Sequence, residues 1–450
     1  MGTERKRAQQ RRNTSGRQVS ISFLLLLFVS LFHFPRSPNF VRTCAAGVDS
    51  ATASTTTPEG RLTVFDDVWQ TVYDRYYDSS FHGVDWWGQR RLFRALAADA
   101  RGQQEFYAVL HRLLASLHDA HTRAFSPEEK FDWLHPRFVT VGLSLREIQS
   151  ELMVVAVARR SEAQRVGIRA GDVIETIGGQ SAQPRLEQKV REQAGSSTPQ
   201  AARLFALAAL TDGPPETTVE IEWRGADGKL HQAGLRRERH ERSFALRIHH
   251  HRKVAVVELD AFTQTLALEF ARALDGELRH ARGIVLDLRS NGGGDAEAMA
   301  EIASALLPPA TALGQFIDRH GNIALKLETT SMPRLSAHQV RPLQVPFVIL
   351  TSERTSSAAE ILISALRSAG TATVLGSQTC GCVLAVRTRH TLPDGGELDV
   401  SELDYQTALG VRLEGVGIKP DEIFRLTRSD IYAGRDRMLE SAIARLRDQR

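Results

Sequence analysis

A serine lies at the junction between an apolar run and a predicted helix, in the stretch TSSAAE (residues 355–360). The first N–H groups of a helix have no intrahelical acceptor, and the helix dipole favours negative charge there. Ser357 at this junction would therefore suit a nucleophile. An ordinary N-cap is the alternative, because Ser and Thr are preferred at that position without any chemistry.

Glycines follow a second apolar run, in NGGG (residues 291–294) after IVLDL (residues 284–288). Glycine lets backbone N–H groups approach a ligand closely, so this loop could form an oxyanion hole. A flexible turn is the alternative. The chain contains neither a G-x-G-x-x-G nor a Walker pattern, which disfavours nucleotide binding.

Histidines offer a general base and a weaker case for metal. His121 lies in LHDAHT (residues 117–122), where a neighbouring aspartate could support it as a base or a ligand. His118 and His121 form an H-x-x-H pair, but no further ligand lies nearby. His249–His251 reads as an exposed turn between domains. We expect no metal site and no cofactor.

Three cysteines do not make a disulfide framework, and two of them form a C-x-C pair, Cys380 and Cys382. Without nearby His or further Cys, the pair lacks a four-ligand set for zinc. Cysteines separated by one residue bridge only with strain. The sequence therefore predicts two small, partly buried thiols of unassigned role.

The N-terminus reads as an export signal. Basic residues precede the apolar run ISFLLLLFVSLFHF (residues 21–34), whose length is typical of a signal peptide and short for a membrane span. Cys44-Ala45-Ala46 could be a cleavage site, and an uncleaved N-terminal anchor with membrane association is the alternative. The chain carries 57 basic and 53 acidic residues, and the excess comes from this N-terminus, so nucleic-acid binding is not expected.

Along the chain, the predicted secondary structure changes from helices to a mixture of strands and helices. We expect a signal or anchor at residues 1–46, a linker at 47–60, a helical domain at 61–136 and a β-module at 137–240. Strands and helices then alternate through residues 241–430, which favours a βαβ-type sheet covered by helices. One final helix is expected within residues 431–450. The fold class is α/β, of α+β arrangement.

Several motifs in this order resemble the carboxyl-terminal processing peptidase family, including its tricorn-like branch. The resemblance covers roughly residues 62–430 and rests on LASLHDAHTRAFSPEEKF, EAQRVGIRAGDVIETIGG, GIVLDLRSNGGG, TSSAAEI and LEGVGIKPDE. It implies a helical N-terminal cap, a PDZ-like β-module and a ββα core of the ClpP/crotonase type.

The resemblance also assigns roles. Ser357 matches the nucleophile, and Gly292, Gly293 and the N–H of Ala358 match the oxyanion hole. Many members carry a lysine base where this chain has Cys382. A cysteine cannot replace that base, because it is an anion when deprotonated and a poor base when protonated. The tricorn-like branch uses Ser–His–Glu instead, which implies His121 as base and Glu414 as the orienting carboxylate.

The implied function is an exported serine endopeptidase, of the periplasm or cell envelope, that cleaves proteins near their C-termini. The PDZ-like module would capture the C-terminus of an unfolded or C-terminally exposed substrate through residues Val141, Gly142, Leu143 and Ser144. A homo-oligomer is left open. The alternatives are a catalytically inactive binding or adaptor protein, favoured by the missing lysine, and a secreted lipid- or retinoid-binding protein on the same fold.

Overall fold

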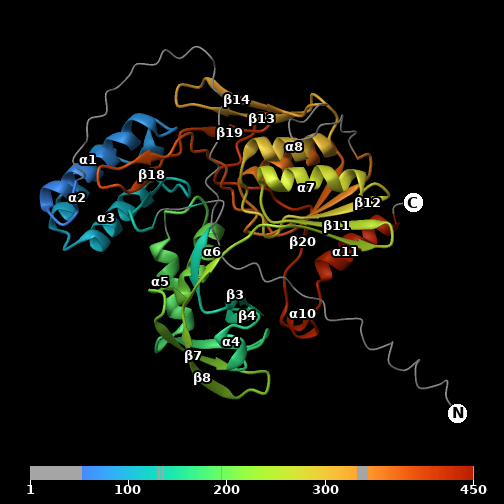
Figure 1. Ribbon diagram of the computed structural model, residues 1–450, viewed down its shortest axis with the longest axis horizontal. Coiled ribbons are helices and arrows are strands. Elements are labelled where there is room, and N and C mark those ends of the chain that lie inside the picture. Colours follow the sequence, from blue (N-terminus) through green and yellow to red (C-terminus); the bar gives the residue numbers. More distant parts are fainter. Residues whose placement is uncertain (1–52, 130–131, 133–135, 194, 332–342, 449–450) are drawn as a thin grey trace.

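The computed structural model describes residues 53–129, 132, 136–193, 195–331 and 343–448. It has three lobes: a helical lobe at the left of Figure 1, a sheet-and-helix lobe at the right, and a smaller lobe below them. The predicted export segment, residues 21–34, lies outside the described residues. Within the described ranges, no helix is both long and apolar enough to cross a membrane.

A six-stranded sheet organises the right-hand lobe. Its strand order is β10-β11-β12-β15-β16-β20, parallel throughout except for β10, which runs antiparallel to β11. The strands are β10 (Leu246–His251), β11 (Val254–Leu259), β12 (Gly283–Asp287), β15 (Phe347–Thr351), β16 (Ala372–Gly376) and β20 (Glu422–Ile423). The α/β prediction is confirmed, with one correction: the histidine run lies on edge strand β10 and not in an interdomain turn.

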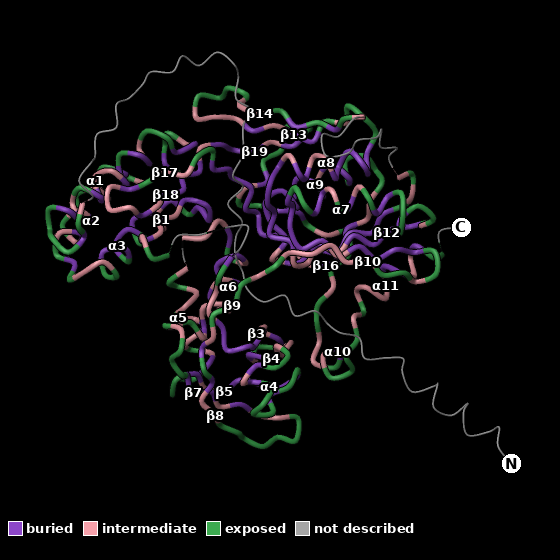
Figure 2. Tube along the Cα trace, in the orientation of Figure 1, coloured by how far each residue is buried: buried purple, intermediate pink, exposed green. Residues whose placement is uncertain are grey.

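Both faces of this sheet are buried, which explains the nearly continuous apolar strands. One face carries α7 (Gln264–Asp275), α8 (Ala296–Leu306) and α9 (Ala358–Ser368), and the other carries α11 (Arg437–Asp448). Strand residues alternate between the two cores: Ala255, Val257, Ile284, Leu286 and Ile349 face the first, and Val254, Val256, Val285, Val348 and Leu350 face the second. Figure 2 shows the buried residues concentrated along these strands.

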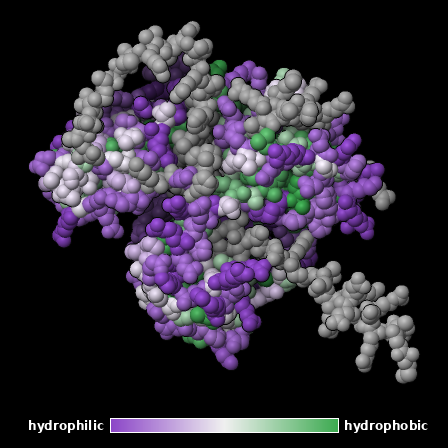
Figure 3. All heavy atoms as spheres, viewed as in Figure 1, coloured by the Kyte–Doolittle hydropathy of each residue, from purple (hydrophilic) through white to green (hydrophobic). Residues whose placement is uncertain are grey.

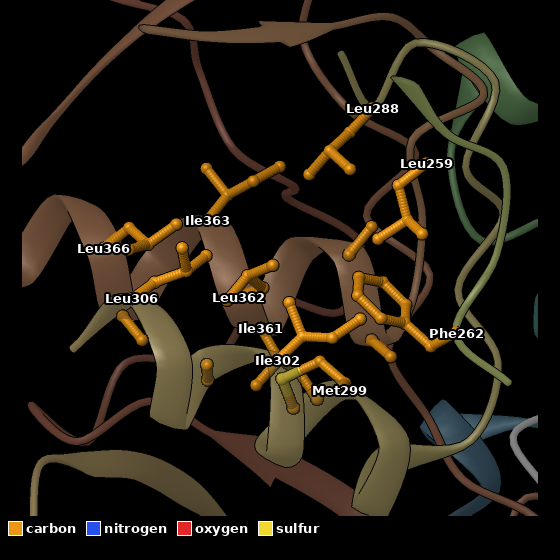
Figure 4. Close-up of a cluster of buried hydrophobic side chains, with 14 of the residues drawn as sticks. Leu259, Phe262, Leu288, Met299, Ile302, Leu306, Ile361, Leu362, Ile363 and Leu366 are labelled. Atoms are coloured by element: carbon orange, nitrogen blue, oxygen red, sulfur yellow. The ribbon is translucent and has the colours of Figure 1, made fainter. Parts of the chain in front are cut away.

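Helix α9 lies within the larger core, which fixes the start of that helix. Figure 4 shows Ile361, Leu362 and Leu366 of α9 against Ile302 and Leu306 of α8. Leu362 is completely buried. A helix held along its length by such packing presents its first turn, and therefore Ser357, in a fixed position.

The C-terminal stretch forms two helices where the sequence predicts one. Helix α10 (Arg428–Ala433) ends at Gly434, which adopts a left-handed conformation with φ of 59°, and α11 begins at Arg437. A glycine in this conformation is a common helix terminator. The linker prediction also runs too long, because α1 begins at Pro58.

The helical lobe contains residues from two distant parts of the chain. Helices α1 (Pro58–Arg75), α2 (Trp86–Asp99) and α3 (Gln103–Ala115) pack with Leu384, Leu392, Leu398 and Val400 in one core. Strand β1 (Arg123–Phe125) pairs antiparallel with β18 (Glu397–Asp399), which also pairs with β17 (His390–Thr391). The segment between α3 and β1, which contains His121, therefore leads into a strand that pairs with a distant, C-terminal part of the chain within the helical lobe.

The lower lobe is a second sheet with helices. Its strand order is β3-β4-β5-β7-β8, with β6 paired to β5, and β2 (Arg137–Thr140) pairs separately with β9 (Glu238–Glu241). The strands are β3 (Leu143–Ile148), β4 (Glu151–Val157), β5 (Val173–Ile177), β6 (Gln180–Ser181), β7 (Thr218–Arg224) and β8 (Leu230–Arg236). The predicted hairpin turn at residues 225–228 connects β7 and β8. Hydrophilic residues cover most of this lobe in Figure 3.

Helices α4 (Glu162–Arg165), α5 (Ala182–Glu192) and α6 (Pro199–Ala208) complete the lower lobe. The sequence predicts α6 but not α5. Arg203 of α6 donates to Glu147 of β3 at 2.6 Å, which ties α6 to the first strand of the sheet. A third sheet, β14-β13-β19, flanks the right-hand lobe and comprises β13 (Ala312–Ile317), β14 (Ile323–Glu328) and β19 (Asp404–Gln406).

Candidate active site

Three loops meet at one edge of the central sheet. They follow β12, β15 and β16, three neighbouring parallel strands, at their carboxyl ends. The first contains residues 291–294, the second leads to Ser357, and the third contains residues 377–386. Ligands of open α/β sheets usually bind outside the carboxyl ends of the strands, so this edge is the natural place for a site.

Ser357 occupies a strained backbone conformation immediately before α9. Its φ of 57° and ψ of −125° lie where residues other than glycine are rare. Such a conformation costs about 1–3 kcal/mol and persists only when the surrounding structure enforces it. Ser357 is 2% exposed and buried against the glycine loop. Strain at a buried serine between strand and helix favours the nucleophile over the ordinary N-cap.

The glycine loop lies directly against this serine. A Cβ atom built on Gly293 would come within 2.6 Å of Ser357 Cβ, and the residue has φ of 99°. No side chain fits there, so the position requires glycine for two independent reasons. The hydroxyl of Ser356 donates to the Gly292 carbonyl at 2.9 Å and joins the two loops.

The expected oxyanion hole needs one correction. The N–H of Gly293 donates to Asn291 Oδ1 at 2.8 Å and is therefore already engaged. The N–H groups of Gly292 and Ala358 have no acceptor among the described residues. These two amides, and not that of Gly293, are therefore the candidate donors at this point. Gly293 instead provides the space that brings the loop and the serine together.

Glu360 binds the serine backbone to the third loop. Its Oε2 accepts the N–H of Ser357 at 3.0 Å and that of Cys382 at 3.1 Å. Its Oε1 accepts the N–H of Gly381 at 2.9 Å and the hydroxyl of Thr379. Burial raises the pKa of Glu360 to about 7, and these hydrogen bonds oppose that rise. The sequence contains a signal for the contact between Ser357 and Glu360, because S-x-x-E at a helix start is a capping-box pattern.

The third loop contains the largest departure from expectation. Cys380 and Cys382 form a disulfide, and their Cα atoms are 5.3 Å apart, within the usual range for such a bond. Gly381, with φ of 70°, turns the chain between them. The prediction of two free thiols is wrong, because a glycine at the middle position allows the two side chains to converge. The segment is also not a strand, and its N–H groups hold two carboxylates.

His121 reaches this region from the helical lobe. It is completely buried, and its Nδ1 lies 3.8 Å from Asp119 Oδ1. Asp119 also accepts the N–H of His121 at 2.7 Å and the hydroxyl of Thr122, whose oxygen in turn accepts the N–H of Ser401. Ala120 packs with Cys380 and Cys382 in a small buried cluster. The histidine loop thus lies against the same disulfide-bonded segment that holds Glu360.

Glu414 is buried against the same segment. Its Oε2 accepts the N–H of Val383 at 2.6 Å and that of Leu384 at 3.2 Å. Burial and the neighbouring charge of Asp119 raise its pKa to about 8, which the hydrogen bonds only partly offset. The carboxyl is therefore protonated at neutral pH, which avoids a second negative charge beside Asp119.

The predicted peptide-binding residues lie in the lower lobe. Val141, Leu143 and Ser144 are buried, and Gly142 has φ of 83° just before β3. Arg146 of β3 donates to Glu353 at 2.8 Å, in the loop that leads to Ser357. Within the described part of the chain, no group of three or more His, Cys, Asp or Glu side chains could hold a metal ion.

Comparison with known families agrees with this arrangement. Residues 253–424 match the description "Peptidase family S41", and residues 58–115 match "Tricorn protease C1 domain". Together the two matches cover slightly more than half of the chain and both of the lobes that meet at the site. By this match, the chain carries a peptidase family S41 domain in its right-hand lobe. It is a serine-type peptidase, and its substrates are proteins.

Similar proteins include processing proteases. The chain is 27% identical over 365 residues to a carboxyl-terminal-processing protease of Synechocystis sp.. The alignment covers 79% of each chain. The chain is 26% identical over 376 residues to the chloroplastic carboxyl-terminal-processing peptidase 1 of Arabidopsis thaliana, covering 80% of this chain and 71% of that protein.

Two solved structures share the fold. The photosystem II D1 C-terminal processing protease aligns with a TM-score of 0.53 and 24% identity, covering 82% of this chain and 93% of the other. Mature CPAF aligns with a TM-score of 0.64 and 13% identity, covering 87% and 99%. The predicted fold class is therefore confirmed at the level of the whole chain.

Replacing Gly293 with alanine tests the packing of the glycine loop on the serine. We expect Gly293→Ala to lower kcat/KM by about 100-fold or more, because the new methyl group displaces Ser357 from its reactive position. Gly321→Ala is the matched control: Gly321 also has positive φ, but its Cβ would meet nothing within 4 Å. Equal activity of the two variants in a peptide-cleavage assay would contradict the geometry.

The raised pKa of Glu414 predicts a pH-dependent stability. Between the ordinary carboxyl pKa and about 8, the unfolded chain is ionised at this residue while the folded chain keeps the proton. Unfolding then releases a proton, so the free energy of unfolding of the wild type falls as pH rises through that window. Glu414→Gln lacks this dependence and should gain stability relative to the wild type between about pH 5 and about pH 8.

Denaturant unfolding at a series of pH values measures that difference. Glutamine keeps an oxygen acceptor for the amides of Val383 and Leu384, so the comparison isolates the charge. Glu328→Gln, at an exposed carboxylate, controls for a general effect of removing one negative charge. Parallel pH profiles for the wild type and Glu414→Gln would show that the buried carboxyl is not protonated in the folded protein.

Proposed function

We propose that this protein is an exported peptidase that cleaves proteins near their C-termini, with Ser357 as the nucleophile. The observation that carries the proposal is the setting of Ser357. Its backbone is held in a strained turn by a buried carboxylate, against a glycine loop, at the first turn of α9. The carboxyl-terminal processing activity named for the relatives supports the class of substrate.

His121 is the general base in this proposal. A neutral imidazole takes the proton of the serine hydroxyl as Oγ attacks the scissile carbonyl, and later returns it to the leaving amine. The Asp119 carboxylate, 3.8 Å from Nδ1, stabilises the imidazolium that forms. Both side chains are fully buried, so water does not screen this interaction. Glu414, which is protonated at neutral pH, supports the loop beside them.

The tetrahedral intermediate carries its charge on the former carbonyl oxygen. The N–H groups of Gly292 and Ala358 are the proposed donors to that oxygen. Ala358 is the first residue of α9, whose dipole also favours the negative charge. One donor of this kind contributes about 100- to 1,000-fold to turnover in other serine peptidases.

The lower lobe is proposed to act as a PDZ-like module that captures the substrate's C-terminus. Its strand β3 lies at the end of the sheet order, so an extended peptide could pair with the free edge. Two contacts connect this lobe to the catalytic loops. Arg146 of β3 binds Glu353, and the Thr198 hydroxyl at the start of α6 donates to the Cys380 carbonyl at 2.7 Å.

Export is proposed from the N-terminal sequence. The basic and apolar segments of residues 1–34 support delivery to the periplasm or cell envelope, with removal of the signal or retention of an anchor. Bacterial and chloroplastic processing proteases among the relatives support a location outside the cytoplasm. A homo-oligomer is a further proposal, and a measurement of the oligomeric state tests it.

The inactive-adaptor alternative rests on the missing lysine. The buried His121–Asp119 pair provides a different base, and the strained Ser357 would have no reason to persist in a protein that only binds. These two observations favour the enzyme, and nothing specific favours the lipid- or retinoid-binding alternative.

Cleavage of one extended peptide tests both the chemistry and the capture. The protein without residues 1–46 is compared with its Ser357→Ala and His121→Ala variants. We expect each variant to lose about 10⁴-fold or more in kcat, as removal of a nucleophile or base does elsewhere. His118→Ala, at an exposed histidine of the same loop, should retain activity.

The substrate is supplied with a free and with an amidated C-terminus. Capture of the carboxylate predicts a higher KM for the amidated peptide with little change in kcat. Equal cleavage by the wild type and Ser357→Ala would refute the nucleophile. Identical KM values for the two peptides would refute the capture while leaving the catalytic assignment intact.

A further inference from the structure

The Cys380–Cys382 disulfide is buried at the centre of the site. Cys380 is 2% exposed and Cys382 is 0% exposed. The bond closes a small ring around Gly381, which has positive φ and whose Cβ would approach within 2.9 Å of the backbone nitrogens of Val416 and Gly417. The ring therefore has one fixed conformation and close neighbours on the loop that carries Glu414.

Two N–H groups of this ring hold the carboxylate that positions the nucleophile. Gly381 and Cys382 donate to Glu360 at 2.9 and 3.1 Å, and Cys382 shares Oε2 of that carboxylate with the N–H of Ser357. A continuous chain of contacts therefore runs from the disulfide through the Glu360 carboxylate to the serine backbone. The N–H groups of Gly381 and Cys382 point toward one buried carboxylate only as long as the disulfide ring fixes their directions.

The other groups of the ring contact three further segments of the site. The Cys380 N–H donates to the Thr355 carbonyl at 2.9 Å, in the loop before the nucleophile. The Gly381 carbonyl accepts the N–H of Gly415 at 2.9 Å, next to Glu414. Both cysteines pack against Ala120, which precedes His121. The crosslinked segment is thus the common support of the serine, histidine and glutamate loops.

We propose that the Cys380–Cys382 disulfide is a redox-controlled positioning element, and that its reduction to two thiols lowers turnover. The inference rests on Ser357 as the proposed nucleophile. A small dithiol supplies the two electrons. One thiolate of the reagent attacks a sulfur of the Cys380–Cys382 bond and forms a mixed disulfide with the protein. The second thiolate of the reagent then breaks that mixed disulfide. The protein gains two thiols with two protons, and the reagent leaves as its cyclic disulfide. The released segment loses the ring that directs its amides.

The test compares the oxidised, reduced and reoxidised wild type with the double variant Cys380→Ala/Cys382→Ala. Mass spectrometry after alkylation reports the state of the pair. The readouts are kcat, KM, and the rate at which a fluorophosphonate modifies Ser357. We expect reduction to lower kcat and the modification rate by about tenfold or more, with KM nearly constant, and reoxidation to restore both.

The double variant should show the low kcat with or without the dithiol. A double variant that turns over within about twofold of the wild type overturns the inference, whether or not the native disulfide yields to the reagent. If the double variant does not fold, an unchanged kcat of the reduced wild type overturns it. Activity that survives Ser357→Ala would instead refute the proposed function.

Discussion

The buried carboxylate of Glu360 is the interaction on which the site depends. It has no access to water, so each of its hydrogen bonds replaces solvation that burial removes. Four donors from two segments meet it: the N–H of Ser357 on one side, and groups of residues 379–382 on the other. Because loss of a partner leaves a buried acceptor unsatisfied, the carboxylate fixes the start of α9 relative to the third loop.

Catalytic geometry in this protein is assembled from distant parts of the chain. The parallel sheet brings three loops to one edge, and the loop that contains His121 packs against the third of them through Ala120. Neither lobe contains both the serine and the histidine. Burial raises the pKa values of both Glu360 and Glu414, and the neighbouring charge of Asp119 raises that of Glu414 further. Protonation of Glu414 lessens the repulsion.

The sequence predicted those parts of the fold that depend on local patterns. Apolar runs such as IVLDL located the buried strands, because both faces of a parallel sheet are covered. Ser357, His121 and the glycine loop were selected because their residue types suit a chemistry, and their proposed roles came from the family resemblance. The break at Gly434 and the helix α5 were missed, since single glycines and polar helical segments give weak signals.

What escaped prediction depends on long-range contacts. The N–H of Gly293 is engaged by Asn291, which no spacing rule reveals. The disulfide was rejected on general geometry, and only the conformation of Gly381 makes it fit. Glu360 received no role from the sequence, because its partners at residues 379–382 lie about twenty positions away. Asp119 was noted beside His121, but its burial and orientation required coordinates.

The rate at which a fluorophosphonate modifies Ser357 in a Glu360→Gln variant tests the central claim most directly. Glutamine keeps one acceptor oxygen but has an NH₂ donor in place of the other. Two of the four N–H and O–H donors around residue 360 would then meet a donor instead of an acceptor. Asp430→Asn is the control, because it alters the same kind of capping box in α10. We expect Glu360→Gln to slow modification by about tenfold or more, and Asp430→Asn to leave the rate unchanged. An unchanged rate in Glu360→Gln, with the variant folded, would contradict the account.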